Sequence, residues 1–373
     1  MRRASPMSMS RRVGAAPDNP PSPGSSRVSS GNTRRAAGVV AGVLPKLSLL
    51  DLATVGRDQP ISEALADTVT LAQRADELGS FERLWFAEHH NMSRIASAAT
   101  SVLIAHVAAR TERIRVGSGG VMLPNHSPLV IAEQFGTLAE LYPDRIDLGL
   151  GRAPGTDGAT MRALRTDPRA AESFPQDVRE LQGYLSGDTL IDGIHAYPGR
   201  GTRVPLYVLG SSLFGAQLAA AYGLPYAFAS HFAPDALQQA VRVYRERFTP
   251  SEQLSSPYVI AAANVVAADD SATATELADK VLRARVRMLA GRVGSGSLDE
   301  DMVTALMDSA VGAQARHMLT HTIVGDPEQV ASGLSDFAAL ADADELILTN
   351  PAPGLDERVR TLEILAGLVG RAS

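Results

Sequence analysis

The sequence contains no cysteine among its 373 residues. This absence excludes disulfide bonds, thiolate metal ligands and a cysteine nucleophile, and it is compatible with a reducing cytoplasm, where we expect the protein to reside. The sequence also lacks any run of about 18 uncharged apolar residues, the length that a membrane-spanning helix requires. We therefore expect a soluble globular protein whose chemistry does not involve a thiol.

The formal charge of −6 is distributed unevenly along the chain. Residues 1–45 hold seven arginines and one aspartate, a charge of +6, which leaves −12 on residues 46–373. An acidic body disfavours contact with the phosphate backbone of nucleic acids. We therefore expect no nucleic-acid partner.

Residues 1–45 are rich in Arg, Ser, Pro and Gly and poor in large apolar side chains. Such a segment cannot bury enough apolar surface to offset the entropy lost on ordering, so we expect a disordered tail. An Arg-rich, acid-poor leader also resembles an organellar transit segment or part of a secretion signal, but this one lacks a clear apolar core and a cleavage pattern. An unstructured extension or an upstream start codon is the simpler interpretation, and residues 46–373 are expected to form the folded domain.

After residue 45 the apolar pattern alternates between short strand-like runs and longer helical ones, and eight such units can be counted. Alternation of this kind predicts an α/β fold with a parallel sheet, and eight units favour a closed (β/α)8 TIM barrel over an open sheet. Insertions at residues 186–203 and before Gly325 account for the length beyond a minimal barrel. The expected strands are residues 47–52, 83–87, 114–117, 145–150, 204–209, 225–229, 258–267 and 345–348, and residues 273–340 are expected to be helical, with breaks at 291–297 and 325–327.

A barrel of this type places its active site at the carboxyl ends of the strands. Glu88, His89 and His90 follow the second expected strand. Neighbouring strand residues point to opposite faces, so the two histidines cannot both aim at one metal ion, and no HExxH spacing exists; we expect no metal here. An imidazole in this position can exchange a proton near neutral pH, which favours a functional role over a structural one.

Two glycine-rich segments end the third and fourth expected strands. Around Gly119 and Gly120 the backbone either passes beneath the face of a ligand or forms a simple bulge. Gly151 precedes Arg152, which is placed to reach an anion or to polarise a carbonyl, although a tight turn with a surface arginine is an equal alternative. The run resembles a dinucleotide turn, but Pro154 replaces the third glycine, and the run follows the fourth expected strand, whereas a dinucleotide turn follows the first.

Ser211 and Ser212 follow the fifth expected strand and open a helix. Free N–H groups, the helix dipole and two hydroxyls suit a phosphate, and an ordinary serine N-cap is the alternative. His317 and His321 have the i, i+4 spacing of a chelating pair, but without a third ligand we favour a solvated helix face or a mobile lid. His126 is interpreted as local structure.

In this order and spacing, four segments resemble the luciferase-like flavin-dependent monooxygenases, the family of the bacterial luciferase subunits, and especially its single-component-length branch. The resemblance covers nearly everything after residue 45, and it is specific for the family but weak for the substrate. The segments are AEHH at 87–90, RIRVGSGGVMLPNHSPLVIAEQFGTLAELYPDRIDLGLGRAPG at 113–155, YVLGSS at 207–212 and VGDPEQV at 324–330.

The resemblance implies an eightfold barrel that binds reduced flavin mononucleotide (FMN) at its carboxyl face, usually as a dimer, and activates dioxygen as a flavin C4a-hydroperoxide. It therefore implies an FMN-dependent monooxygenase that oxidises a small organic substrate, with aldehydes and secondary metabolites among the classes that the family accepts. Light emission does not follow from it. No nicotinamide motif is present, so we expect a separate flavin reductase, although some relatives use NAD(P)H directly.

The resemblance also implies roles for individual residues. Gly151 stands where luciferase has a reactive cysteine, so any role of that thiol is lost here. By matching motif, His89 is the catalytic histidine, Glu88 the acid that supports it, Gly119 and Gly120 the place of a non-prolyl cis peptide beneath the flavin ring, Arg152 the arginine beside the flavin, and Ser211 and Ser212 the phosphate-binding turn.

Two alternatives remain open at this point. Related barrels bind the deazaflavin F420 at the same face, so an F420-dependent oxidoreductase is the nearer one. A non-catalytic flavin-binding protein is the other, and the retained EHH and glycine segments argue against it.

Overall fold

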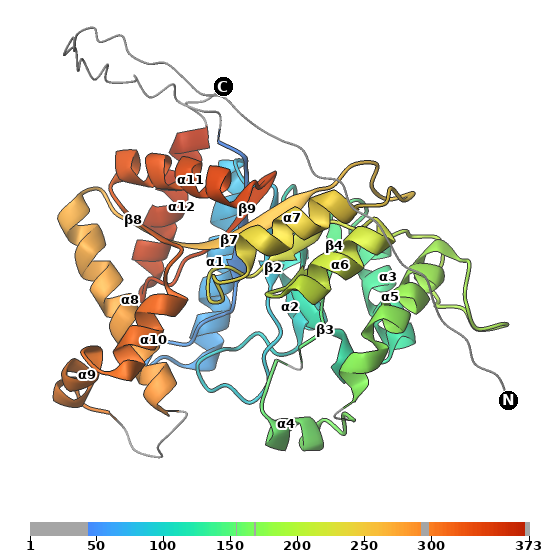
Figure 1. Cartoon of the computed structure of the whole chain (residues 1–373), viewed down its shortest axis with the longest axis horizontal. Helices are drawn as coiled ribbons and strands as arrows, with labels where there is room; N and C mark the ends of the chain where they lie inside the picture. Colours follow the sequence, from blue (N-terminus) through green and yellow to red (C-terminus); the bar gives the residue numbers. More distant parts are fainter. Residues whose placement is uncertain (1–43, 154, 168, 292–297, 370–373) are drawn as a thin grey trace, which may run out of the picture. The chain divides into compact units, whose positions relative to one another are not determined.

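A closed sheet of parallel strands forms the core of the unit Ala41–Ser373 in the computed structural model (Figure 1). The structure describes residues 44–153, 155–167, 169–291 and 298–369, so nearly all of the expected tail lies outside the described residues. The sheet order is β6-β5-β4-β3-β2-β1-β9-β7-β8, and a further pairing of β6 with β7 closes a barrel of eight strands. The predicted TIM barrel is confirmed.

The eight barrel strands correspond to the eight that the sequence predicts, although β3 runs five residues past its expected end at Gly117 and contains Gly119 and Gly120. The barrel strands are β1 (Lys46–Asp51), β2 (Arg83–Phe86), β3 (Arg115–Met122), β4 (Ile146–Gly151), β5 (Leu206–Gly210), β6 (Tyr226–Phe228), β7 (Val259–Ala267) and β9 (Glu345–Thr349).

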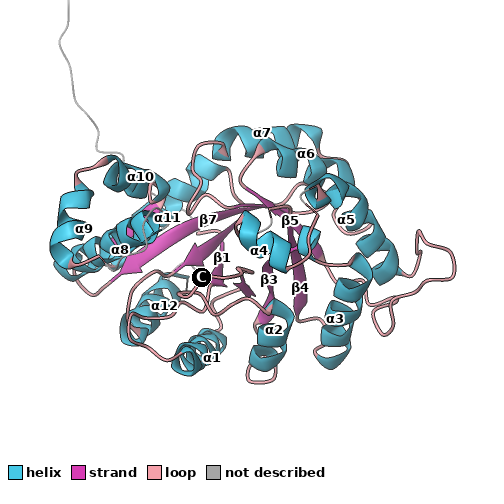
Figure 2. Ribbon diagram, turned by 90° about the horizontal axis from the view of Figure 1, so that it is seen from below, coloured by secondary structure: helices cyan, strands magenta, loops and turns pink. Residues whose placement is uncertain are grey.

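Helices surround these strands (Figure 2). Among the described residues, no helix is long and apolar enough to cross a membrane. The helices are α1 (Ile61–Leu78), α2 (Thr100–Ala108), the short 3-10 helix η1 (Leu123–Asn125), α3 (Pro128–Leu141), α4 (Gly158–Ala163), α5 (Ala170–Ser186), α6 (Leu213–Tyr222), α7 (Leu237–Arg247), α8 (Ser271–Gly291), α9 (Glu300–Met307), α10 (Ala310–Met318), α11 (Pro327–Ala341) and α12 (Leu355–Val369).

One expectation about secondary structure is wrong. The sequence predicts helix from the break at 291–297 up to the break at 325–327, but the structure contains a ninth strand there, β8 (Thr322–Gly325). It pairs with the last four residues of β7, Asn264–Ala267, which extend beyond the pairing of β7 with β6. The β-branched run at 322–324 favours a strand. The predicted break at 291–297 falls mostly on residues outside the described ones.

Charged side chains fill the barrel at its amino end. Arg83, the first residue of β2, donates from Nη1 to Asp147 Oδ2 at 2.7 Å and from Nε to Glu345 Oε1 at 2.9 Å. All three side chains are buried. Burial alone would lower the pKa of the guanidinium, but the charges of Asp147 and Glu345 raise it above its ordinary value, so Arg83 stays positively charged.

Further side chains donate to the same two carboxylates, so Asp147 and Glu345 each have several hydrogen-bond partners. Buried charges are tolerated in proteins when hydrogen bonds of this kind surround them. The additional donors are Arg115 and Trp85 to Asp147, and Tyr258 and Ser48 to Glu345, while the hydroxyl of Tyr207 accepts a bond from Arg83.

We predict that Arg83→Met destabilises the fold by about 3–5 kcal/mol, because it leaves Glu345 buried without its counter-ion. Urea denaturation measures this loss. Arg203→Met is the matched control: Arg203 pairs with Glu252 at 2.9 Å, but the side chains are 61% and 87% exposed, and such a pair contributes less than about 1 kcal/mol. Equal losses in the two variants would contradict a structural role for the buried network.

Candidate active site

The carboxyl ends of the strands carry most of the residues that the sequence singled out. This is the end on which α4 lies, at the bottom of Figure 1 and toward the viewer in Figure 2. The charged network closes the opposite end, so function is expected at this mouth.

Glu88 forms the centre of a cluster beyond the end of β2. Nε2 of His90 lies 2.9 Å and Nε2 of His126 lies 2.8 Å from the same carboxylate oxygen, Oε1. The other oxygen accepts the backbone N–H of Met122 at 3.1 Å. The carboxylate is 2% exposed, so these contacts compensate its burial.

The hydrogen bonds of this cluster set the protonation of Glu88. Burial alone would raise the pKa of the carboxyl, but the hydrogen bond and charge of His126, together with the hydrogen bonds of His90 and the Met122 N–H, hold it below its ordinary value. His126 was assigned to local structure in the sequence; instead it reaches back from the segment after η1 to Glu88. Local spacing gave no signal for this contact, because the two residues are distant in sequence.

His89 points away from that cluster. Its backbone N–H donates to the carbonyl of Ser97 at 3.0 Å, and its ring Nδ1 lies 3.4 Å from the carbonyl oxygen of Gly155. Thr156 donates to the carbonyl of His90 at 3.2 Å. The loop after β4 is thereby attached to the loop after β2, and the two adjacent histidines have different partners.

The peptide bond between Gly119 and Gly120 is cis, as the resemblance implies. The glycines around it also have a packing reason. A Cβ on Gly120 would lie 2.7 Å from the carbonyl oxygen of Gly149, and one on Gly149 would lie 2.2 Å from that of Ser118. A Cβ on Gly151 would lie 2.7 Å from the sulfur of Met122. Close contact between β3 and β4 therefore explains these glycines, and their contact with a cofactor stays a prediction.

Arg152 lies beside the start of α6. Its guanidinium carbon lies 4.0 Å from the ring centroid of Phe214, the second residue of that helix, and its Nε donates to the carbonyl of Ala171 at 3.1 Å. The stacking holds a cation near the Ser211–Ser212 turn. Ser212 is the N-cap of α6, yet its hydroxyl makes no capping bond, and both serines are exposed.

The sequence model of the luciferase-like monooxygenases matches residues 46–343. This chain belongs to the luciferase-like monooxygenase family. A luciferase-like monooxygenase of Escherichia coli (strain K12) is 44% identical over 318 residues, which cover 85% of this chain and 95% of the relative. The N-acetyl-S-alkylcysteine monooxygenase of Bacillus subtilis (strain 168) is 30% identical over 336 residues, covering 87% and 98%. Membership supports an oxidoreductase of the monooxygenase type.

Solved structures agree with this assignment. The luciferase-like chain superposes on apo-MsnO8 with a TM-score of 0.77 at 33% identity, covering 88% of this chain and 98% of that one. The oxygenating constituent of 3,6-diketocamphane monooxygenase from Pseudomonas putida, in complex with FMN, gives 0.66 at 15% identity, with 88% and 98% covered. An F420-dependent secondary alcohol dehydrogenase gives 0.64 at 16%, with 88% and 99% covered. At such identities these two comparisons concern the fold alone.

A second histidine at the carboxyl end of the barrel, His231, was not singled out from the sequence. It stands three residues after β6, just as His89 stands three residues after β2. Its Nδ1 is buried and has no hydrogen-bond partner among the residues that the structure describes. Burial, and then the charges of Arg285 and His89, lower the pKa of His231 to about 3, so this imidazole is neutral at neutral pH.

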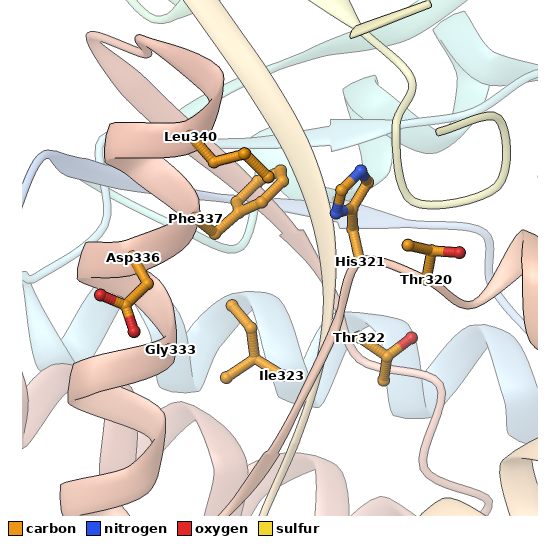
Figure 3. A pocket seen from close by; sticks show the side chains of 8 residues that line it. All are labelled: Thr320, His321, Thr322, Ile323, Gly333, Asp336, Phe337 and Leu340. Atoms are coloured by element: carbon orange, nitrogen blue, oxygen red, sulfur yellow. The ribbon is translucent and has the colours of Figure 1, made fainter. Parts of the chain in front are cut away.

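His317 and His321 do not form a pair. His317 lies 2.9 Å from Asp235, whereas His321 lies beyond the end of α10 and packs against Phe337 of α11. Figure 3 shows His321 in a hollow between β8 and α11, on the outside of the barrel. The predicted solvated helix face therefore fits His317 alone.

We predict that the unfolding free energy falls between pH 6.5 and 5. In the unfolded chain the imidazole of His231 takes up a proton near its ordinary pKa of 6.5, but in the folded chain only near 3, so acid favours unfolding. The contribution of this one group is up to about 1.4 kcal/mol per pH unit. His231→Phe should flatten the dependence measured by denaturant titration, and histidine NMR should show no titration of His231 above pH 5. A titration midpoint near 6.5 would contradict this.

Proposed function

We propose that this family member is an FMN-dependent monooxygenase, which uses reduced FMN and dioxygen to oxidise a small organic substrate. The observation that carries the proposal is the arrangement at the start of α6, where an uncapped helix end and a stacked arginine meet. The deazaflavin F420 is tested beside FMN, because proteins of this fold were solved with each of these cofactors.

The residues at α6 fit a phosphate monoester. The first N–H groups of a helix lack intrahelical acceptors and carry a partial positive charge. The hydroxyls of Ser211 and Ser212 add donors, and Arg152 adds a full positive charge. An anion bound there would accept hydrogen bonds from these N–H groups and hydroxyls.

Bound reduced flavin would supply the electrons with which dioxygen is activated. In the proposal, His89 holds or transfers a proton at the barrel mouth, on the side opposite His231. Glu88 positions the loop that carries His89, because its oxygens contact the N–H of Met122, the last residue of β3, and the imidazole of His126, beyond η1. The loop after β4, attached at Gly155 and Thr156, limits the access of water to His89.

The partners are part of the same proposal. The described chain has no dinucleotide turn, so we propose that a separate reductase provides the reduced flavin. We also propose a homodimer, which is supported by large apolar side chains that α2 and α3 leave exposed to solvent. They are Val102, Val130 and Leu141.

Ser212→Glu should weaken FMN binding by at least about tenfold, or about 1.4 kcal/mol, because a carboxylate would repel the phosphate. Fluorescence titration of the flavin measures the dissociation constant. Ser332→Glu, which makes the same change at an exposed serine of α11, should leave it unaltered. FMN and F420 are titrated into both variants and the parent chain. If neither cofactor binds the parent chain, the proposed function is wrong.

His89→Ala should retain FMN and lose about 10²–10⁴-fold in turnover, the usual contribution of general acid–base catalysis. Oxygen consumption with reduced FMN and an N-acetyl-S-alkylcysteine, the substrate class named for the Bacillus subtilis relative, provides a first assay, and a long-chain aldehyde a second. His317→Ala is the control. Equal turnover of His89→Ala and the parent chain would remove His89 from the mechanism.

A further inference from the structure

We propose that Glu88, His90 and His126 form a binding site for one divalent transition-metal ion such as Zn²⁺. The site lies beside His89 but uses none of its atoms. The sequence argued against a metal because His89 and His90 cannot converge from a regular strand. The structure replaces that pair with His90 and His126, which converge on one carboxylate.

The ligand atoms are already spaced for an ion. The two imidazole nitrogens and the carboxylate oxygen all lie within 4.8 Å of one another. Metal–ligand bonds of about 2.0–2.2 Å separate neighbouring ligands by about 3.0–3.5 Å. The observed contacts of 2.9 Å and 2.8 Å to Oε1 therefore need to open by only a few tenths of an ångström. Two histidines and one carboxylate are ligands that Zn²⁺ accepts, with a further position left for water.

The negative charge of Glu88 also favours a divalent cation. Glu88 is buried, and among the described residues its hydrogen-bond and ion-pair partners are His90, His126 and the backbone of Met122, with no lysine or arginine. A buried carboxylate is stabilised by a cation held against it, and a divalent ion would be a stronger and more permanent one than an imidazole. The imidazoles of His90 and His126 are 18% and 29% exposed, so an ion can enter and the displaced protons can leave.

The surroundings hold the ligands in place. The oxygen of Glu88 that does not face the histidines accepts the N–H of Met122, and the carbonyl of His90 accepts the hydroxyl of Thr156. Such outer contacts orient metal ligands in general. A bound ion would connect the loop after β2 to the segment after η1 and so stiffen the backbone on both sides of His89.

The experiment uses the full chain without a histidine tag, treated with EDTA and then freed of chelator. Zn²⁺ is titrated by calorimetry, and Co²⁺ by its visible absorption. We expect one equivalent to bind, a higher melting temperature with Zn²⁺, and affinity reduced more than about tenfold in Glu88→Gln, His90→Gln and His126→Gln. His317→Gln, which removes an exposed histidine that pairs with Asp235, should bind as the parent chain does.

Two results would overturn the proposal: no stoichiometric uptake by the parent chain, or equal uptake by His126→Gln. Circular dichroism establishes that each variant is folded, and His90 and His126 are replaced at partly exposed positions, where glutamine is accommodated. Zn²⁺ titration requires no flavin, so a failed FMN titration leaves this result unaffected, and a failed Zn²⁺ titration leaves the proposed cofactor site unaffected.

Discussion

The barrel depends on the placement of one buried cation between two buried carboxylates. Arg83 begins β2, Glu345 begins β9 and Asp147 lies near the start of β4, so their contacts connect strands from different parts of the closed sheet. Buried ion pairs contribute little net stability, but a shifted strand would leave a charge without its partner at high cost. The network therefore specifies register, because a strand displaced by one residue would turn its charged side chain away from the others.

This arrangement also determines where function can be located. Above the charges, the barrel interior is filled by an apolar cluster that includes Leu50, Trp85 and Ile260. A ligand has no room at the amino end, where the donors and acceptors are already paired. Unpaired groups are found at the other end: Nδ1 of His231 and Oδ2 of Asp51 are buried there without partners among the described residues. The charged end that specifies strand register is thus separated by one apolar layer from the carboxyl end, where His231 and Asp51 have these unpaired atoms.

The sequence predicts the fold well because most barrel strands, such as β7 and β9, are buried on both faces and read as apolar runs. It fails at β8, where a strand of four residues is too short to stand out between helices. At the site, it locates His89, Arg152 and the serine turn, since each follows a strand directly. It misses His126, whose contact with Glu88 links the segments after β3 and β2 and is not encoded by linear spacing. It also misses His231, although that residue follows β6 at the same distance at which His89 follows β2.

The strand order connects the two halves of the mouth. His89 follows β2 and Ser212 follows β5, and β3 and β4 lie between those strands in the sheet. A ligand that contacted both Ser212 and His89 would therefore cross the ends of β3 and β4. Those ends carry Gly120 and Gly151, whose missing side chains allow the two strands to pack closely. A Cβ on Gly120 would meet the carbonyl of Gly149, and one on Gly151 would meet the sulfur of Met122. The neighbouring strand therefore fills the space that these glycines leave, and the packing of β3 against β4 accounts for them without any cofactor.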